Sequence, residues 1–202
     1  MPLRYGLMKL IFTRLLAATS LALALMSTAQ AASFEGVHFD DSAKLSDTDL
    51  RLNGLGMRAV LWLKGYVAGL YLSEKASTAQ SVYQLSGPKR IQMKMLVQAT
   101  SADFRKALIN GIHANVPQSD WPKLQSRIEQ FELAINEVGT VKKGDTITLD
   151  FIPSRGLVVS LNNQAKGQAI AGADFFNAVL AIFLGSAPVD ARLKSGLLGL
   201  SN

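Results

Sequence analysis

The residue of this chain best suited to bind an anion is Arg58, which stands in an apolar run with Met57, Ala59, Val60 and Leu61. An arginine in such a run points either to water, as most charged residues do, or into a cleft. A buried arginine needs an anion to offset the loss of its hydration. A guanidinium suits an anion because its charge is permanent and its donors are planar.

Other residues that could do chemistry are isolated in the sequence. Tyr66 and Tyr71 follow Arg58, but a tyrosine, with an ordinary pKa of ~10, needs a strong shift to act as a base, so strand packing is expected for both. His38 and His113 have no second ligand at a spacing such as H-E-x-x-H, so no metal site is predicted. The chain has no Cys, which excludes thiol nucleophiles and Cys-based metal sites.

Two further motifs are absent from the sequence. The glycines at 54 and 56 lack the third glycine of a dinucleotide-binding loop, because position 59 is Ala. There is also no G-x-S-x-G, the motif of many serine hydrolases.

The element that must position Arg58 is the stretch Asn53–Leu72, NGLGMRAVLWLKGYVAGLYL. Two apolar runs of strand length flank Lys64-Gly65, which predicts a β-hairpin with its turn at that dipeptide. We expect this hairpin to supply the central strands of a sheet.

Around this hairpin the periodicity predicts strands and helices grouped in blocks. Strands are expected at 34–39, 90–97, 146–152, 157–161 and 167–171, and loops at 40–48 and 162–166. Helices are expected at 77–85, at 102–114 with Ser101 as cap, from Pro122 to about Gly139, at 174–184 and at 189–198. Antiparallel hairpins with blocks of helices favour an α+β fold with helices on one face of a sheet.

The amino-terminal residues have the pattern of an export signal. Basic residues at 4, 9 and 14 precede the apolar run Leu15–Met26, and Ala29-Gln30-Ala31 forms an A-x-A site. We therefore predict a signal peptide at 1–31, a single domain at 32–202 and a periplasmic location; a retained membrane anchor is the alternative. Cleavage would leave 18 basic residues against 15 acidic ones, too small an excess to predict nucleic-acid binding.

Several segments in order give the chain a family resemblance. GLGMR leads into KGYVAGLYL, followed by SADFRKALINGI, GDTITLDFIPSRGLVVSLN, GQAIAG and AIFLGSAPVDARLKSGLLG. This order resembles the chalcone isomerase-like family, specifically its bacterial exported members, over nearly all of the mature chain. The resemblance implies an open-faced β-sandwich, in which helices cover a large antiparallel sheet and a ligand cleft lies between. Plant enzymes of the family close a chalcone into a flavanone without a cofactor, and other relatives bind fatty acids.

The resemblance also implies candidate site residues. The family's arginine, which would stabilise a developing enolate or hold a carboxylate, matches Arg58. The plant enzymes' threonine at the start of the return strand falls at Tyr66. The tyrosine and asparagine of their ligand-contacting helix fall near Phe104 and Gly111, with Asn110 one position away. Their later threonine falls at Lys166. Retention of the arginine without the surrounding hydroxyls favours binding over cyclisation.

Three functions remain open on the sequence alone. The first is a non-catalytic binder of a small amphipathic ligand, such as a fatty acid or a phenolic compound, with Arg58 as anchor and contacts from Tyr66, Phe104, Asn110 and Lys166. The second is a cofactor-independent isomerase or lyase that uses Arg58 and Tyr66 on an enolate. The third is an envelope protein with a protein partner. A monomer without a membrane span after signal cleavage is expected.

Overall fold

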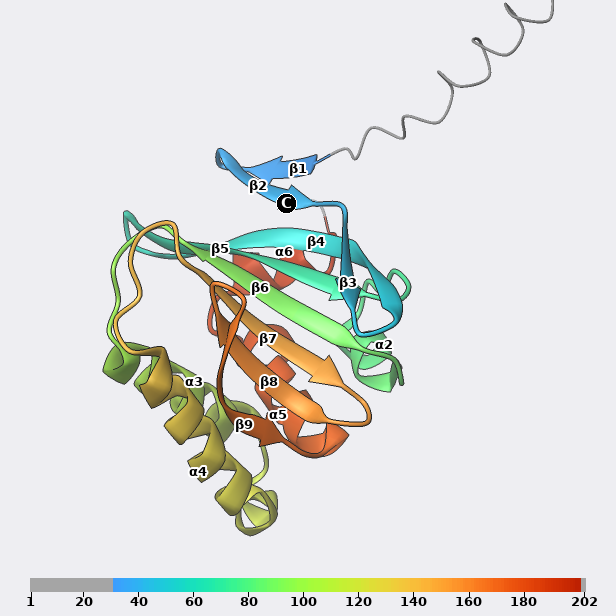
Figure 1. Cartoon of the computed structure of the whole chain (residues 1–202), viewed down its shortest axis with the longest axis vertical. Coiled ribbons are helices and arrows are strands. Elements are labelled where there is room, and N and C mark those ends of the chain that lie inside the picture. Colours follow the sequence, from blue (N-terminus) through green and yellow to red (C-terminus); the bar gives the residue numbers. More distant parts are fainter. Residues whose placement is uncertain (1–30, 201–202) are drawn as a thin grey trace, which may run out of the picture. The chain divides into compact units, whose positions relative to one another are not determined.

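A computed structural model of the protein describes residues 31–200. The predicted signal peptide lies outside these residues except for its last residue, Ala31, which begins the first strand. The main body is a seven-stranded antiparallel sheet whose strands are neighbours in chain order (Figure 1). Its strands are β3 (Ser42–Leu45), β4 (Thr48–Val60), β5 (Leu63–Leu72), β6 (Lys89–Met95), β7 (Thr146–Ile152), β8 (Gly156–Leu161) and β9 (Gln164–Ile170).

The helices share one hydrophobic core with one face of this sheet. They are α2 (Ala79–Gln84), α3 (Ser101–Asn115), the 3₁₀-helix η2 (Gln118–Asp120), α4 (Trp121–Val138), α5 (Ala173–Leu184) and α6 (Ala191–Leu197). Helix α5 is almost wholly apolar and buries Phe175, Phe176 and Phe183. The predicted α+β class, with one large antiparallel sheet covered on one face by helices, is confirmed.

A short hairpin covers part of the opposite sheet face. Strands β1 (Ala31–Phe34) and β2 (Val37–Asp40) pair with each other and not with the main sheet. Phe39 of β2 packs with Val67 and Tyr71 of β5 in a second, smaller hydrophobic core. Because side chains alternate along a strand, β5 serves both cores, and seven of its ten residues are buried.

A β-bulge at Asn53 changes which face of the sheet the side chains of β4 reach. Before it, Leu50 and Leu52 pack in the smaller core; after it, Leu55 and Met57 do so. The extra residue therefore shifts the alternation by one position. The even-numbered positions after the bulge, including Arg58, turn toward the helices. Asn53 itself is buried, and its side-chain amide bonds the backbone of Ala76 at 2.8 and 2.9 Å.

The turn predicted at Lys64-Gly65 is wrong. Val60 pairs with Leu63, so the two turn residues are Leu61 and Trp62, and Leu61 has a left-handed φ of 55°. Gly65 instead lies inside β5, unpaired at a second bulge opposite Arg58 and Ala59. Apolar residues in the turn hid the reversal, because turn predictions rely on Gly, Asn and Asp.

Other expectations need smaller corrections. The middle of the seven strands is β6, so the β4–β5 hairpin is off-centre. The predicted strand 34–39 is a hairpin reversing at Glu35-Gly36, and the predicted loops 40–48 and 162–166 contain β3 and the start of β9. Helix α3 is capped by Thr100 and not Ser101. The Thr100 side chain accepts a hydrogen bond from the backbone amide of Asp103 at 3.2 Å, and the Asp103 carboxylate accepts one from the backbone amide of Thr100.

Candidate functional site

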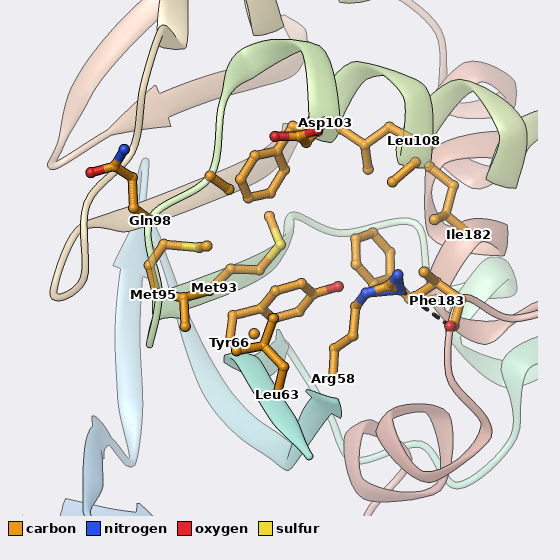
Figure 2. A pocket seen from close by; sticks show the side chains of 16 residues that line it. Arg58, Leu63, Tyr66, Met93, Met95, Gln98, Asp103, Leu108, Ile182 and Phe183 are labelled. Atoms are coloured by element: carbon orange, nitrogen blue, oxygen red, sulfur yellow. Dashed lines mark hydrogen bonds between the residues drawn. The ribbon is translucent and has the colours of Figure 1, made fainter. Parts of the chain in front are cut away.

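A cavity of about 290 Å³ lies between the sheet and helices α3 and α5. Figure 2 shows its lining, with Arg58 and Tyr66 from the β4–β5 hairpin on one side and the helices opposite. Leu63, Gln98 and Asp103 line it and are also exposed, so they mark its opening to solvent. The lining residues are Arg58, Leu63, Gly65, Tyr66, Met93, Met95, Val97, Gln98, Ala99, Asp103, Phe104, Ala107, Leu108, Ile182, Phe183 and Val189.

Arg58 lies after the Asn53 bulge, on the cavity side of β4. Its Nη1 donates to the carbonyl oxygen of Val189, in the α5–α6 connection, at 3.3 Å. None of the ion pairs found among residues 31–200 involves Arg58. Asp190 is next to Val189, but its carboxylate accepts from the first turn of α6 and, at 3.4 Å, from the amide of Ala59. Its charge is therefore already engaged by backbone amides, and the other donors of Arg58 remain available to an anion.

Tyr66 lies directly opposite Arg58 in the β4–β5 ladder and projects from the same sheet face. The residue is only 8% exposed. Burial raises the pKa of Tyr66 well above its ordinary value; the Arg58 guanidinium opposes this effect and the Asp190 carboxylate adds to it. Among the described residues, no group hydrogen-bonds the Tyr66 hydroxyl. The phenol thus stays protonated near neutral pH and can donate to a molecule in the cavity.

The remaining walls are mostly apolar. Met93 and Met95 come from the helix-facing side of β6, Phe104 and Leu108 from α3, and Ile182 and Phe183 from α5. Methionine side chains adapt to irregular spaces, so this wall can adjust to different ligand shapes.

Helices α3 and α5 nearly touch further along α3. A methyl group added to Gly111 would lie 2.7 Å from the Cγ2 of Ile182. The close approach at this glycine closes the helix layer, whereas one and two turns earlier Ala107 and Phe104 border open space. The position that the family resemblance assigned to an asparagine therefore carries a helix contact.

The cavity brings together three of the five residues predicted to bind a ligand: Arg58, Tyr66 and Phe104. Asn110 is exposed on the outer side of α3, beside Arg105 and Glu132, and does not line the cavity. Lys166 also lies outside it, on the edge strand β9, paired with Val159.

Several lining residues were missed from the sequence. The alternation over 91–97 placed Met93, Met95 and Val97 on one strand face, and Phe183 lay on an apolar helix, but neither pattern separates a cavity wall from a filled core. The carbonyl of Val189 had no sequence signal, because any residue supplies a carbonyl.

The arrangement is a cationic donor and a neutral hydroxyl donor at the side of an apolar cavity. Such a site suits a molecule with an anionic or oxygen-rich head and an apolar body. Within residues 31–200, no cluster of three or more His, Asp or Glu side chains is placed to hold a metal ion. None of the helices in that range has both the length and the apolar character needed to span a membrane.

Comparisons with known proteins agree with this architecture. The solved structure of a fatty-acid binding protein of Arabidopsis thaliana (AtFAP1) superposes with a TM-score of 0.60 at 16% identity, covering 84% of this chain and 96% of that one. At this identity the likeness establishes the fold alone. No curated protein sequence matches the chain. The model of one family, described as chalcone isomerase-like, matches residues 31–199. The chain belongs to the chalcone isomerase-like family.

Proposed function

We propose that this protein binds a small amphipathic anion, such as a fatty acid, in the cavity, and that it does so in the periplasm after removal of a signal peptide. Arg58 holds the carboxylate, Tyr66 donates a second hydrogen bond, and the Met, Phe and Leu side chains enclose the tail. The observation that carries the proposal is the pairing of two available donors, Arg58 and Tyr66, inside a cavity whose other polar side chains, Gln98 and Asp103, lie at its opening. The similar plant protein is named as a fatty-acid binder, which supports the same ligand class.

The cavity volume restricts the ligand. At about 290 Å³ it lies at the small end of the ~300–1,000 Å³ range of small-molecule pockets. A single-tailed amphiphile suits this space better than a two-tailed phospholipid. A tail longer than the cavity would leave through the opening marked by Leu63 and Gln98.

Binding can be tested with the purified protein. Its organic extract is analysed by mass spectrometry, and affinities for saturated fatty acids of increasing length are measured by displacement of a fluorescent probe. We expect a bound single-tailed acid, and a 10- to 100-fold lower affinity for Arg58→Met, since a hydrogen bond to a charged group contributes ~1.5–3 kcal/mol. Arg58→Lys should recover only part of this loss, because lysine keeps the charge without the planar fork.

The matched control is Arg155→Ala, which removes an exposed arginine from the β7–β8 turn, outside the cavity. It should leave affinity unchanged. The absence of any bound acid, together with no thermal shift on adding fatty acids, would contradict the proposal.

A second function is favoured by the state of Tyr66. A neutral phenol beside a guanidinium could donate a proton or hydrogen bond to an enolate, whereas its raised pKa argues against a role as base. An absorbance assay on chalcone separates the two functions. Turnover that disappears in Arg58→Met and Tyr66→Phe would establish an isomerase or lyase; binding without turnover across a substrate panel would exclude it.

A further inference from the structure

The tip of the β4–β5 hairpin exposes four consecutive large apolar residues. Val60, Leu61, Trp62 and Leu63 are 55%, 84%, 87% and 54% exposed. Single exposed apolar side chains are ordinary on protein surfaces, but a contiguous group is typical of a contact site. This group, the apolar tip (Val60–Leu63), protrudes beyond the end of the sheet (Figure 1).

Local folding does not account for the apolar tip. The φ of Leu61 is 55°, in the left-handed region where a two-residue hairpin turn favours Gly or Asn. A leucine here meets an unfavourable backbone conformation and gains almost no burial. Its side chain, like that of Trp62, would be stabilised only by a contact outside the chain.

The apolar tip adjoins the opening of the cavity. Leu63 belongs to both: it is more than half exposed and also lines the cavity next to Tyr66. Anything that covers the apolar tip would therefore lie directly at the route by which a ligand enters.

Basic residues lie at the same end of the sheet. Hydrogen bonds of 2.9 Å join Gly65 to Leu96 and Met95 to Gly144, so the α4–β7 connection lies beside the base of the apolar tip (Figure 1). That connection carries Lys142 and Lys143, both exposed. Acidic groups near this end of the sheet have partners of their own: Glu35 pairs with Lys64 at 2.7 Å, and Asp145 accepts from the Lys142 amide and the Asn162 side chain. Asp103 and Asp190, which line pockets with Leu63 and Leu61, accept from Thr100 and from the first amides of α6.

We propose that the apolar tip inserts into the headgroup region of an anionic lipid bilayer, with Lys142 and Lys143 against the lipid phosphates. Tryptophan and leucine prefer this interface, and lysines are attracted to its negative surface. A second copy of the chain is a poorer occupant, because a two-residue turn with its neighbours offers far less than the ~800 Å² per partner of a stable protein interface. The few inserted side chains make attachment weak and reversible. One consequence rests on the proposed function: with the apolar tip in the bilayer, the cavity opening would face the lipid, and the amphipathic ligand could pass directly between cavity and bilayer.

The two tryptophans of the chain provide the test. Trp62 is in the apolar tip, whereas Trp121 stacks on His113 and donates to the Val116 carbonyl. Trp121→Phe leaves Trp62 as a single reporter, and Trp62→Phe leaves Trp121. Each variant is mixed with phosphatidylcholine–phosphatidylglycerol vesicles in which the phosphatidylcholine carries bromine on its acyl chains. We expect a blue shift and quenching for Trp62 and neither for Trp121.

Bromine quenches only a tryptophan close to it, so the signal of Trp62 reports on the apolar tip even if another segment of the full chain also attaches to vesicles. Bound protein whose Trp62 stays unquenched would overturn the proposal, as would the absence of binding. A doubled mass in light scattering without vesicles, abolished by Leu61→Asn with Trp62→Ser, would assign the apolar tip to a second copy and overturn it as well.

Variants outside the ligand cavity measure how much the apolar tip and the two lysines each contribute to vesicle binding. Leu61→Asn with Trp62→Ser suits the turn backbone, so the protein should stay folded; we expect vesicle partitioning attributable to the tip to fall at least tenfold. Lys142→Gln with Lys143→Gln should lower binding to anionic vesicles by about fivefold per lysine and leave binding to pure phosphatidylcholine unchanged. Ligand affinity in vesicle-free solution should be unaltered in both. Quenching of Trp62 in a protein that binds no fatty acid would support membrane docking while rejecting the proposed ligand.

Discussion

Helices meet the sheet in two different ways on its covered face. Over β4, helix α6 lies directly on the backbone: a methyl group on Gly54 would collide with the carbonyl oxygen of Gly196 and lie 2.8 Å from the amide nitrogen of Gly199. Over β5 and β6, helices α3 and α5 stand on large side chains such as Met93 and Tyr66, which leave the cavity between them. Small residues thus seal one side of the layer, and large ones hold the other side open.

The contrast shows how one sheet face can be packed tightly against a helix in one part and border a cavity in another. The sealed side fixes the α5–α6 connection, and with it the Val189 carbonyl that bonds Arg58. The proposed anion site, on the hollow side, would need this fixed support, because a binding side chain must be held in position before its ligand arrives.

The largest expected effect comes from breaking the sealed side. Gly54→Ala should lower the free energy of unfolding by about 3 kcal/mol or more, since the methyl group would meet backbone atoms of Gly196, Leu197 and Gly199, which cannot move away singly. Urea denaturation measures it. The control is Gly87→Ala, where the added methyl group would meet only Ser73 at 3.4 Å or more. A loss below about 1 kcal/mol at Gly54 would show that α6 can shift, and would remove the contrast.

The next effect comes from filling the hollow side. Ala107→Phe places a ring in the cavity from α3, so fatty-acid affinity should fall by about 10- to 100-fold while the free energy of unfolding changes by less than about 1 kcal/mol. Titration and urea denaturation give the two values. Ala102→Phe, exposed on the same helix, is the matched control. Unchanged affinity in Ala107→Phe would place the ligand elsewhere.

Two tyrosines of β5 sharpen the comparison. The hydroxyl of Tyr71, on the opposite sheet face, donates to the Asp40 carbonyl at 2.9 Å, whereas that of Tyr66 has no such partner among the described residues. Tyr71→Phe should therefore lower the free energy of unfolding by about 1 kcal/mol. Tyr66→Phe should leave stability within a few tenths of a kcal/mol, yet weaken ligand binding. The reverse pattern would mean that Tyr66 is a structural residue.

The smallest effect concerns Asp174 at the start of α5, away from both regions. Its hydrogen bond to Arg127, at 2.6 Å, lowers the pKa of Asp174 below the ordinary 3.8. Because the pKa of Asp174 is lower in the folded protein, the ionised carboxylate adds to the free energy of unfolding above about pH 4. This addition disappears as the pH falls through the folded-state pKa. Because Asp174 is 64% exposed, the loss should stay below about 1 kcal/mol. Asp174→Asn should remove this part of the acid dependence, as measured by urea denaturation at several pH values.

The sequence predicted the strand pair β7–β8 and helices α3, α4 and α5 closely, because β-branched alternation and a helical apolar stripe are local signals. It missed β3, whose four residues are too few for a periodic pattern, and the Leu61-Trp62 turn, which lacks turn residues. For the site, family resemblance singled out Arg58. Asn110 and Lys166 were placed by position along the chain, which does not show which face of a helix or strand a residue occupies.

The bulge at Asn53 has a consequence for how this chain can change over time. Because one residue is unpaired, the side chains of β4 that pack in the smaller core are at even-numbered positions before the bulge and at odd-numbered positions after it. A deletion of Asn53 would bring Leu52 and Gly54, whose partners Tyr71 and Leu70 are already consecutive in β5, into regular alternation, so Met57 and Arg58 would keep their present faces. The present register is thus compatible with an ancestral β4 that was one residue shorter, in which Arg58 already faced the helices, and the later gain of Asn53 would have left the cavity side unchanged.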